Sequence, residues 1–325
     1  MTGQEATLRQ RSIAVDEGPA REMPSPWLDF LRRFSRNKPA LAGLGVVLLM
    51  FFTGVFAPWL APYSHTDQNL RAVNQPPSLA HPLGTDELGR DLLSRIIWGA
   101  RTALIVSVMV ISINLTMGLL TGSVAGYFGG WVDTLFMRFA DFLFGFPDIL
   151  LVLFIVATTK SRITAWVKSW EGLVGLEGLA RSGFVDFFVV VLALGFVGWP
   201  GMARLVRGQF LHLKEREFVE AARATGATHW QIIRRHLLPN AIPPVIVAVS
   251  LGMGGVVVAE AGLSFIGIGI QPPNASWGTT LLDNYLFWRT RPFMIIVPSL
   301  VLATVAFSFN FLGDGLNEAL NPQLR

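Results

Sequence analysis

A single acidic residue, Glu260, lies inside an otherwise apolar run of the chain, residues 242–266. A charged side chain at the centre of a membrane helix costs about 2.5–3.5 kcal/mol on insertion scales. Such residues usually face the interior of a helix bundle or water. Glu260 therefore either contacts a solute on a translocation path or is a protonated or hydrogen-bonded structural residue. The residue by itself leaves both interpretations open.

Common catalytic motifs do not occur in the chain. There is no cysteine, and none of the four lysines follows a glycine, so a P-loop of the form Gly-x4-Gly-Lys-Ser/Thr is excluded. Neither His-Glu-x2-His nor Gly-x-Ser-x-Gly is present, which argues against an intramembrane hydrolase. We predict no catalytic residue, no metal site and no cofactor bound by this chain. The net charge of +4 is too small to indicate nucleic-acid binding.

The elements that carry Glu260 and its neighbours are long apolar segments. Hydrophobic residues make up 52% of the 325 residues and charged residues only 15%, whereas soluble domains carry about 25% charged residues. A run of roughly 20 apolar residues crosses a bilayer as a helix, and these runs lack the alternation of barrel strands. We predict an all-α membrane protein with six transmembrane helices, at about residues 40–61, 103–125, 142–157, 185–202, 242–266 and 293–312.

The orientation follows from the basic residues beside the first helix. Arg32, Arg33, Arg36 and Lys38 precede it directly, and basic residues are retained on the cytoplasmic side. Both termini are therefore expected in the cytoplasm, as tails of residues 1–39 and 315–325. Residues 62–100 and a charged insertion at 160–181 would lie outside.

The polar segment 217–240 is predicted to form two short helices. The first is expected to bury Phe218, Ala221, Ala222 and Thr225, and Gly226 ends it. The second is expected to begin at Thr228, whose side chain would cap it. One face of this helix would carry the apolar residues Trp230, Ile233 and Leu237. A rigid helix–turn–helix that projects from a bundle turns a partner's motion into rotation of the attached helices.

Glu220-Ala221-Ala222, Gly226 and Leu238-Pro239 resemble the EAA loop of ABC importer permeases, with His236 where the general pattern has isoleucine. Four further stretches resemble the oligopeptide/dipeptide branch, which includes nickel and glutathione permeases. They are residues 81–95, 126–133, 261–278 and 309–325.

The resemblance implies the type I importer permease fold over residues 101–314, and a site in the cell membrane of a bacterium. It also implies four kinds of partner: a second homologous permease, two ATPase subunits that hold ATP and Mg, an extracellular substrate-binding protein and the lipid. The residues implied for ATPase coupling are Glu220, Ala221, Ala222, Gly226, Thr228, His229 and Trp230.

The stretch before the second span has its own pattern. Gly84-Thr85-Asp86 is typical of a turn and helix cap, and the apolar spacing that follows predicts an amphipathic helix at the outer membrane surface. His81, Asp86 and Arg90 would contact the binding protein or form an outer gate. The alternative is that this helix only positions the second span.

Two other functions stay open at this stage. The resemblance implies that the chain forms half of the translocation pathway of an ATP-driven importer for di- or oligopeptides, by alternating access. The same class of importer could instead carry nickel or another small solute. A proton-coupled secondary transporter would also be a helix bundle with buried carboxylates, but it would normally show an internal repeat, and none is visible.

Overall fold

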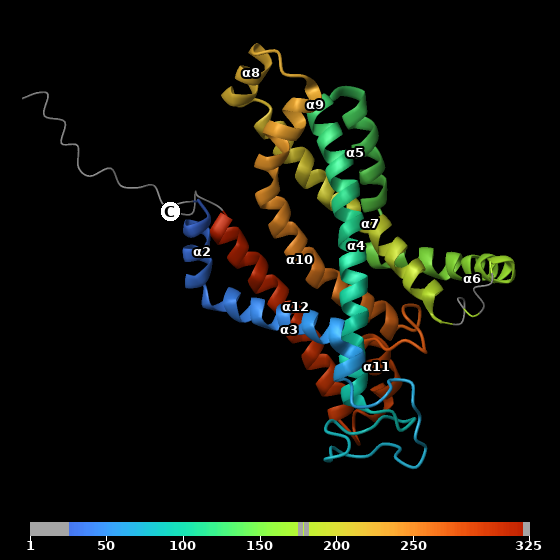
Figure 1. Ribbon diagram of the computed structural model, residues 1–325. Coiled ribbons are helices and arrows are strands. Elements are labelled where there is room, and N and C mark those ends of the chain that lie inside the picture. Colours follow the sequence, from blue (N-terminus) through green and yellow to red (C-terminus); the bar gives the residue numbers. More distant parts are fainter. Residues whose placement is uncertain (1–25, 175–177, 179–181, 321–325) are drawn as a thin grey trace, which may run out of the picture.

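The structure, a computed structural model, describes residues 26–174, 178 and 182–320, and within them it is built of helices (Figure 1). The helices are α2 (Pro26–Arg36), α3 (Lys38–Leu60), α4 (Leu92–Phe128), α5 (Gly130–Phe144), α6 (Asp148–Val174), α7 (Phe184–Leu213), α8 (Glu217–Ala224), α9 (His229–Gln231), a π-helix η1 (Ile232–Leu237), α10 (Leu238–Phe265), α11 (Trp277–Asn284), a 3-10 turn η2 (Tyr285–Phe287) and α12 (Phe293–Leu320). Six helices are long and apolar enough to cross a membrane, which confirms the predicted fold class. Extended pairing in the described residues amounts to one bridge, Thr85 with Asp91.

The third crossing differs from the predicted segment 142–157. α5 ends at Phe144, and the helix that crosses starts at Asp148, because Pro147 disfavours helical backbone in the residue before it. α6 then continues to Val174, so the first part of the expected insertion is helix. Lys160 pairs with Asp186 of α7 at 2.8 Å. Residues 175–177 and 179–181 of that insertion lie outside the described residues, as do 1–25 and 321–325 of the two tails.

The amphipathic helix expected before the second span is not there. Residues 81–91 form turns, and α4 begins only at Leu92 with Asp91 as its N-cap. Gly84 and Gly89 both have positive φ angles, of 79° and 68°, which an α-helix does not accommodate. A Cβ atom on Gly89 would also stand 1.9 Å from the carbonyl oxygen of Asn69. The chain here is a folded cap over the helix end.

α4 and α7 pack closely along a line of glycines. Gly118, Gly122 and Gly126 of α4 face α7, and a Cβ atom on Gly122 would lie 2.5 Å from the carbonyl oxygen of Ala203. Small residues at four-residue spacing let helix backbones approach in this way, and the gain is van der Waals contact. α4 and α7 are therefore expected to move as one body.

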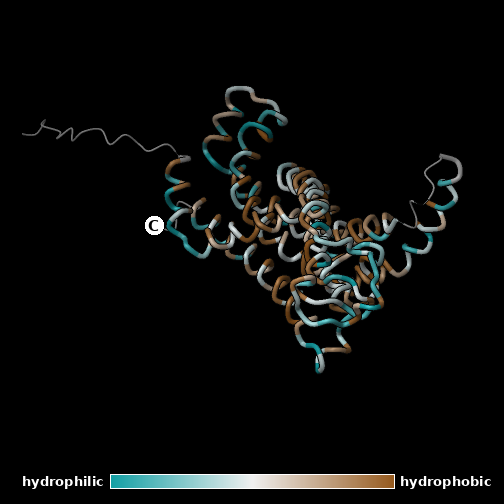
Figure 2. The backbone as a smooth tube through the Cα atoms, turned by 60° about the horizontal axis from the view of Figure 1, so that its bottom comes forward, coloured by the Kyte–Doolittle hydropathy of each residue, from teal (hydrophilic) through white to brown (hydrophobic). Residues whose placement is uncertain are grey.

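The two ends of the bundle carry different polar structures. α8 and α9 project at one end, and residues 61–91 with α11 gather at the other (Figure 1). Figure 2 shows brown and white along the central helices, with teal stretches in the loops that come forward and in the helices that project from the bundle. Many large apolar side chains on the helices are exposed, as expected of a surface covered by lipid or by another subunit.

Candidate functional site

The segment predicted for coupling has the expected turn between its two helices. α8 ends at Ala224, and Gly226 follows with a φ of +82°. The amide of Ala227 then donates to the carbonyl of Ala222 at 3.0 Å, a closure typical of glycine-ended helices. Thr228 caps α9 as predicted, through a reciprocal capping box with Gln231.

The buried face of α8 is narrower than predicted. Only Val219 and Ala222 are buried in this helix, whereas Phe218, Ala221 and Thr225 are exposed, so the predicted burial of those three was wrong. Val219 and Ala222 are three residues apart, so they lie on the same side of α8 and pack this eight-residue helix against the bundle. Glu220 and Ala221 are left on the free face, where small Ala221 permits close approach by another surface.

The second helix also presents a different face from the predicted one. Ile233 and Leu237 are buried, but Trp230 is 66% exposed. The backbone between them is a π-helix, in which the amide of Leu238 bonds to the carbonyl of Ile233, five residues earlier. This wider winding shifts the faces of the helix, so spacing arguments made for an α-helix fail. The indole of Trp230 is free for contact with a partner.

A contact with α4 anchors the helix–turn–helix. The hydroxyl of Tyr127, at the end of α4, lies 2.7 Å from Nδ1 of His229, and Nζ of Lys214 donates to the carbonyl of Gly126 at 3.3 Å. His229 therefore holds α9 in place in this conformation. Nothing in the spacing of the segment itself identifies Tyr127 as its partner, because the two residues are 102 positions apart.

An ion pair beside this anchor joins α5 to α7. Nε and Nη2 of Arg207 donate to the two carboxylate oxygens of Asp133 at 2.5 and 2.6 Å. These hydrogen bonds hold the pKa of the Asp133 carboxyl below its ordinary value. α5, which precedes the third crossing, is thus bound to the helix that leads into α8.

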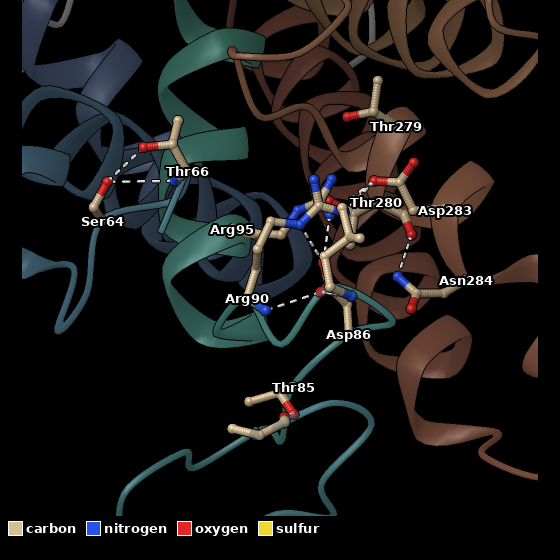
Figure 3. A network of polar contacts seen from close by, with 12 residues as sticks. Ser64, Thr66, Thr85, Asp86, Arg90, Arg95, Thr279, Thr280, Asp283 and Asn284 are labelled. Carbon is tan, nitrogen blue, oxygen red and sulfur yellow. Dashed lines mark hydrogen bonds and ion pairs between the residues drawn. The ribbon is translucent and has the colours of Figure 1, made fainter. Parts of the chain in front are cut away.

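At the opposite end, two arginines and two aspartates form a cluster in which all members but Asp283 are buried (Figure 3). Oδ2 of Asp86 accepts from Nε of Arg90 and from Nη1 of Arg95, both at 2.7 Å. Oδ1 of Asp86 accepts from the amides of Leu88 and Arg90, each at 2.9 Å. Oδ2 of Asp283, in α11, lies 2.8 Å from each arginine. The cluster ties the turns before α4 to α11.

The predicted contact residues His81, Asp86 and Arg90 therefore face inward. Asp86 has 0% exposure, and Arg90 is also buried. Nδ1 of His81 lies 3.0 Å from Oδ1 of Asp91. Asp91 caps α4, because its Oδ2 accepts a hydrogen bond from the amide of Ser94. The pKa of the Glu87 carboxyl is raised, first because the surrounding protein partly desolvates it and then because Asp283 and Asp86 repel its charge. The cluster is built for rigidity of this end, and Arg95 and Asp283 are members that sequence reasoning missed.

Glu260 is enclosed between α10 and the start of α11. Its side chain is 1% exposed, and its Oε1 accepts hydrogen bonds from the hydroxyls of Ser264 at 2.7 Å and Ser276 at 2.8 Å. Ser276 is the N-cap of α11. The contacts match the structural interpretation, and the carboxylate has almost no surface through which a solute could reach it in this conformation.

Six apolar helices with a projecting helix–turn–helix at one end define the class: a multi-pass α-helical membrane protein. Among the described residues, no group of three His, Cys, Asp or Glu side chains is placed to hold a metal ion.

The chain belongs to the family of binding-protein-dependent transport system inner membrane components, whose model matches residues 118–325. Residues 25–77 match the N-terminal transmembrane domain of oligopeptide transport permease C.

Three relatives cover nearly the whole chain. A dipeptide transport system permease protein of Bacillus subtilis is 40% identical over 91% of this chain and 86% of its own length. An oligopeptide transport system permease protein of Haemophilus influenzae is 37% identical, over 93% of this chain and 90% of its own. A glutathione transport system permease protein of Pectobacterium atrosepticum is also 37% identical, over 93% and 92%.

Proposed function

We propose that the chain is one of two related permease subunits of an ATP-driven importer and forms half of the translocation pathway for di- or oligopeptides. The observation that carries the proposal is the exposed face of α8 and α9, with Glu220, Ala221 and Trp230, at the end of two bundle helices. The relatives, named for dipeptides, oligopeptides and glutathione, support a peptide substrate. ATP and Mg bind to separate ATPase subunits, and this chain carries transport only.

The α8–α9 end faces the cytoplasm of a bacterial cell and both termini lie on that side. The basic residues beside α3 support this orientation. Residues 61–91 and α11 then face outward, where an extracellular substrate-binding protein docks. In this arrangement His81, Asp86 and Arg90 keep the outer face rigid and do not touch the binding protein themselves.

The mechanism is alternating access driven through α8 and α9. α8 follows α7 after three residues, and α9 continues through the π-helix into α10, so a displacement of this pair is delivered to both helices. Gly226 and Thr228 set the angle of the pair, and His229 holds it against α4. Moving a two-state equilibrium from 1:99 to 99:1 takes about 5.5 kcal/mol, which ATP binding by the partners supplies through this contact.

The test is affinity purification of the chain, with its natural partners, from membranes solubilised in mild detergent. Ala221→Trp places a large side chain on the exposed face of α8, and Leu79→Trp places the same indole at a fully exposed position at the other end. Wild type and Leu79→Trp are expected to retain a second permease and both ATPases. Ala221→Trp should retain the second permease and lose the ATPases.

Two results would contradict the proposal. One is a wild-type chain that emerges without any ATPase in several mild detergents. The other is an Ala221→Trp variant that keeps its ATPases at wild-type stoichiometry. Peptide uptake that persists after ATP depletion and stops when the proton gradient is collapsed would instead support a proton-coupled secondary transporter.

A further inference from the structure

A pocket of about 270 Å³ lies between α4, α6, α7 and α10, away from both polar ends. Its lining includes Asn114, Gly198 and Gly255, which stand near the middle of α4, α7 and α10 respectively. α7 has 30 residues and is about 45 Å long, so Gly198 lies roughly 20 Å from either end. That depth is within the hydrocarbon core of a bilayer.

Asn114 brings an unused hydrogen-bond acceptor to this pocket. The residue is 7% exposed, and its Oδ1 is buried with no hydrogen-bond donor among the described residues. The opposing position of α7 is Gly198, where a Cβ atom would stand 2.5 Å from Nδ2 of Asn114. The absence of a side chain there makes room for the amide. A buried acceptor without a donor costs stability, and in native structures it calls for an explanation.

Asp148 brings a carboxylate to the same pocket. It is the first residue of α6, it is exposed, and among the described residues that line the pocket it is the only charged one. Among the described residues no hydrogen bond or ion pair engages its carboxylate. A negative charge at a helix N-terminus is favoured by the helix dipole. Glu260, by contrast, is sealed by two serines and does not line the pocket.

The two groups together select a cationic donor. A carbonyl oxygen and a carboxylate both accept hydrogen bonds, so their complement is a positively charged group with several N–H bonds. A peptide amino terminus is such a group, because its pKa of about 7.7–8.0 keeps most of it protonated at neutral pH. The pocket is at the small end of ligand sites, which suits one end of a peptide better than a whole one.

We infer that Asn114 and Asp148 form a site that binds the protonated amino terminus of the transported peptide. The inference rests on the proposed function and adds to it the part of the substrate that this subunit contacts. Gly198 and Gly255 keep the site open: around Gly255 no other atom lies within 4 Å of a Cβ position.

The experiment is uptake of radiolabelled trialanine by the complete importer, with its binding protein, in proteoliposomes loaded with ATP. Asp148→Asn removes the negative charge, whereas Asp148→Glu keeps the charge on a longer side chain. Gly255→Val fills the pocket without a steric clash, and Gly262→Val is its match on the same helix, equally open but outside the pocket. Subunit composition and unfolding temperature are measured for each preparation.

Loss of a charge-assisted hydrogen bond predicts that Asp148→Asn lowers uptake at limiting trialanine by about tenfold or more. Gly255→Val should show a similar loss, while Asp148→Glu recovers part of the rate and Gly262→Val transports normally. Assembled Asp148→Asn and Gly255→Val complexes that both transport like wild type would overturn the site. If one variant does not assemble, the other decides. A wild-type complex that fails to move trialanine with ATP refutes the proposed function instead, so the two failures are distinguishable.

Discussion

Replacing Asp86 by asparagine tests how strongly the buried cluster holds the end of the molecule opposite α8. The wild-type carboxylate accepts four hydrogen bonds, two from backbone amides and two from Arg90 and Arg95. Two arginines and two aspartates cancel in charge, so Asp86→Asn leaves the cluster with one uncompensated positive charge. Removing one partner of a buried ion pair typically costs about 3–5 kcal/mol.

The remaining aspartate decides where in this range the cost falls. Asp283 lies 2.8 Å from both arginines, and its side chain is 21% exposed, so water and Asp283 share part of the loss. We therefore expect about 3 kcal/mol, which by the scaling of soluble domains lowers the unfolding temperature by roughly 5–10 °C. The assay is thermal unfolding of the purified complex in mild detergent, followed by intrinsic fluorescence.

Two further variants make the result interpretable. Glu87→Gln is the same kind of change at the next, exposed position, and it should not lower the unfolding temperature because partial desolvation and the neighbouring carboxylates of Asp283 and Asp86 already disfavour the charge of Glu87. Asp86→Asn combined with Arg95→Met restores neutrality and should regain part of the loss. An unfolding temperature of Asp86→Asn within about 1 °C of wild type would refute the reasoning, as would an equal fall for Glu87→Gln.

Three more predictions follow from single contacts. Gly226→Val should cost about 1–3 kcal/mol and weaken ATPase retention, whereas Gly226→Asn should be milder, because the surrounding space is open and only the left-handed backbone is strained; equal retention by both would argue against this. Glu260→Gln keeps an oxygen for both serines and should preserve uptake and stability, while Glu260→Leu should lower stability by about 1–3 kcal/mol in the same melts; failure of the glutamine variant alone would point to a need for charge. Gly122→Val should separate α4 from α7 at a cost of about 1–3 kcal/mol in thermal unfolding, unlike Gly208→Val, where the space is open.

Hydrophobic run length was enough to predict six spans, and local turn chemistry was enough to predict the cap at Thr228. These features depend on residues close together in the chain. The face of the second short helix in residues 217–240 was misjudged because the π-helix at Ile232–Leu237 breaks the spacing of an α-helix. The segment 81–91 looked like an amphipathic helix from its apolar spacing, but two glycines with positive φ hold it in turns.

Partners far apart in sequence could not be read from the sequence. The pairing of Arg90 with Asp283 crosses 193 positions, and that of Tyr127 with His229 crosses 102. Neither contact has a local signature. The role of Glu260 had two interpretations because its answer depended on Ser276, which reaches it only after α11 packs against α10.

The separation between Arg90 and Asp283 has a consequence for biosynthesis. A ribosome adds about 5–20 residues per second, so Asp283 is made roughly 10–40 s after Arg90. During that interval the two arginines share only Asp86, and α4 has no salt link to α11. The last third of the chain therefore completes the charge balance of the first, and a nascent chain that stops before Asp283 would carry two arginines with Asp86 as their one shared carboxylate partner.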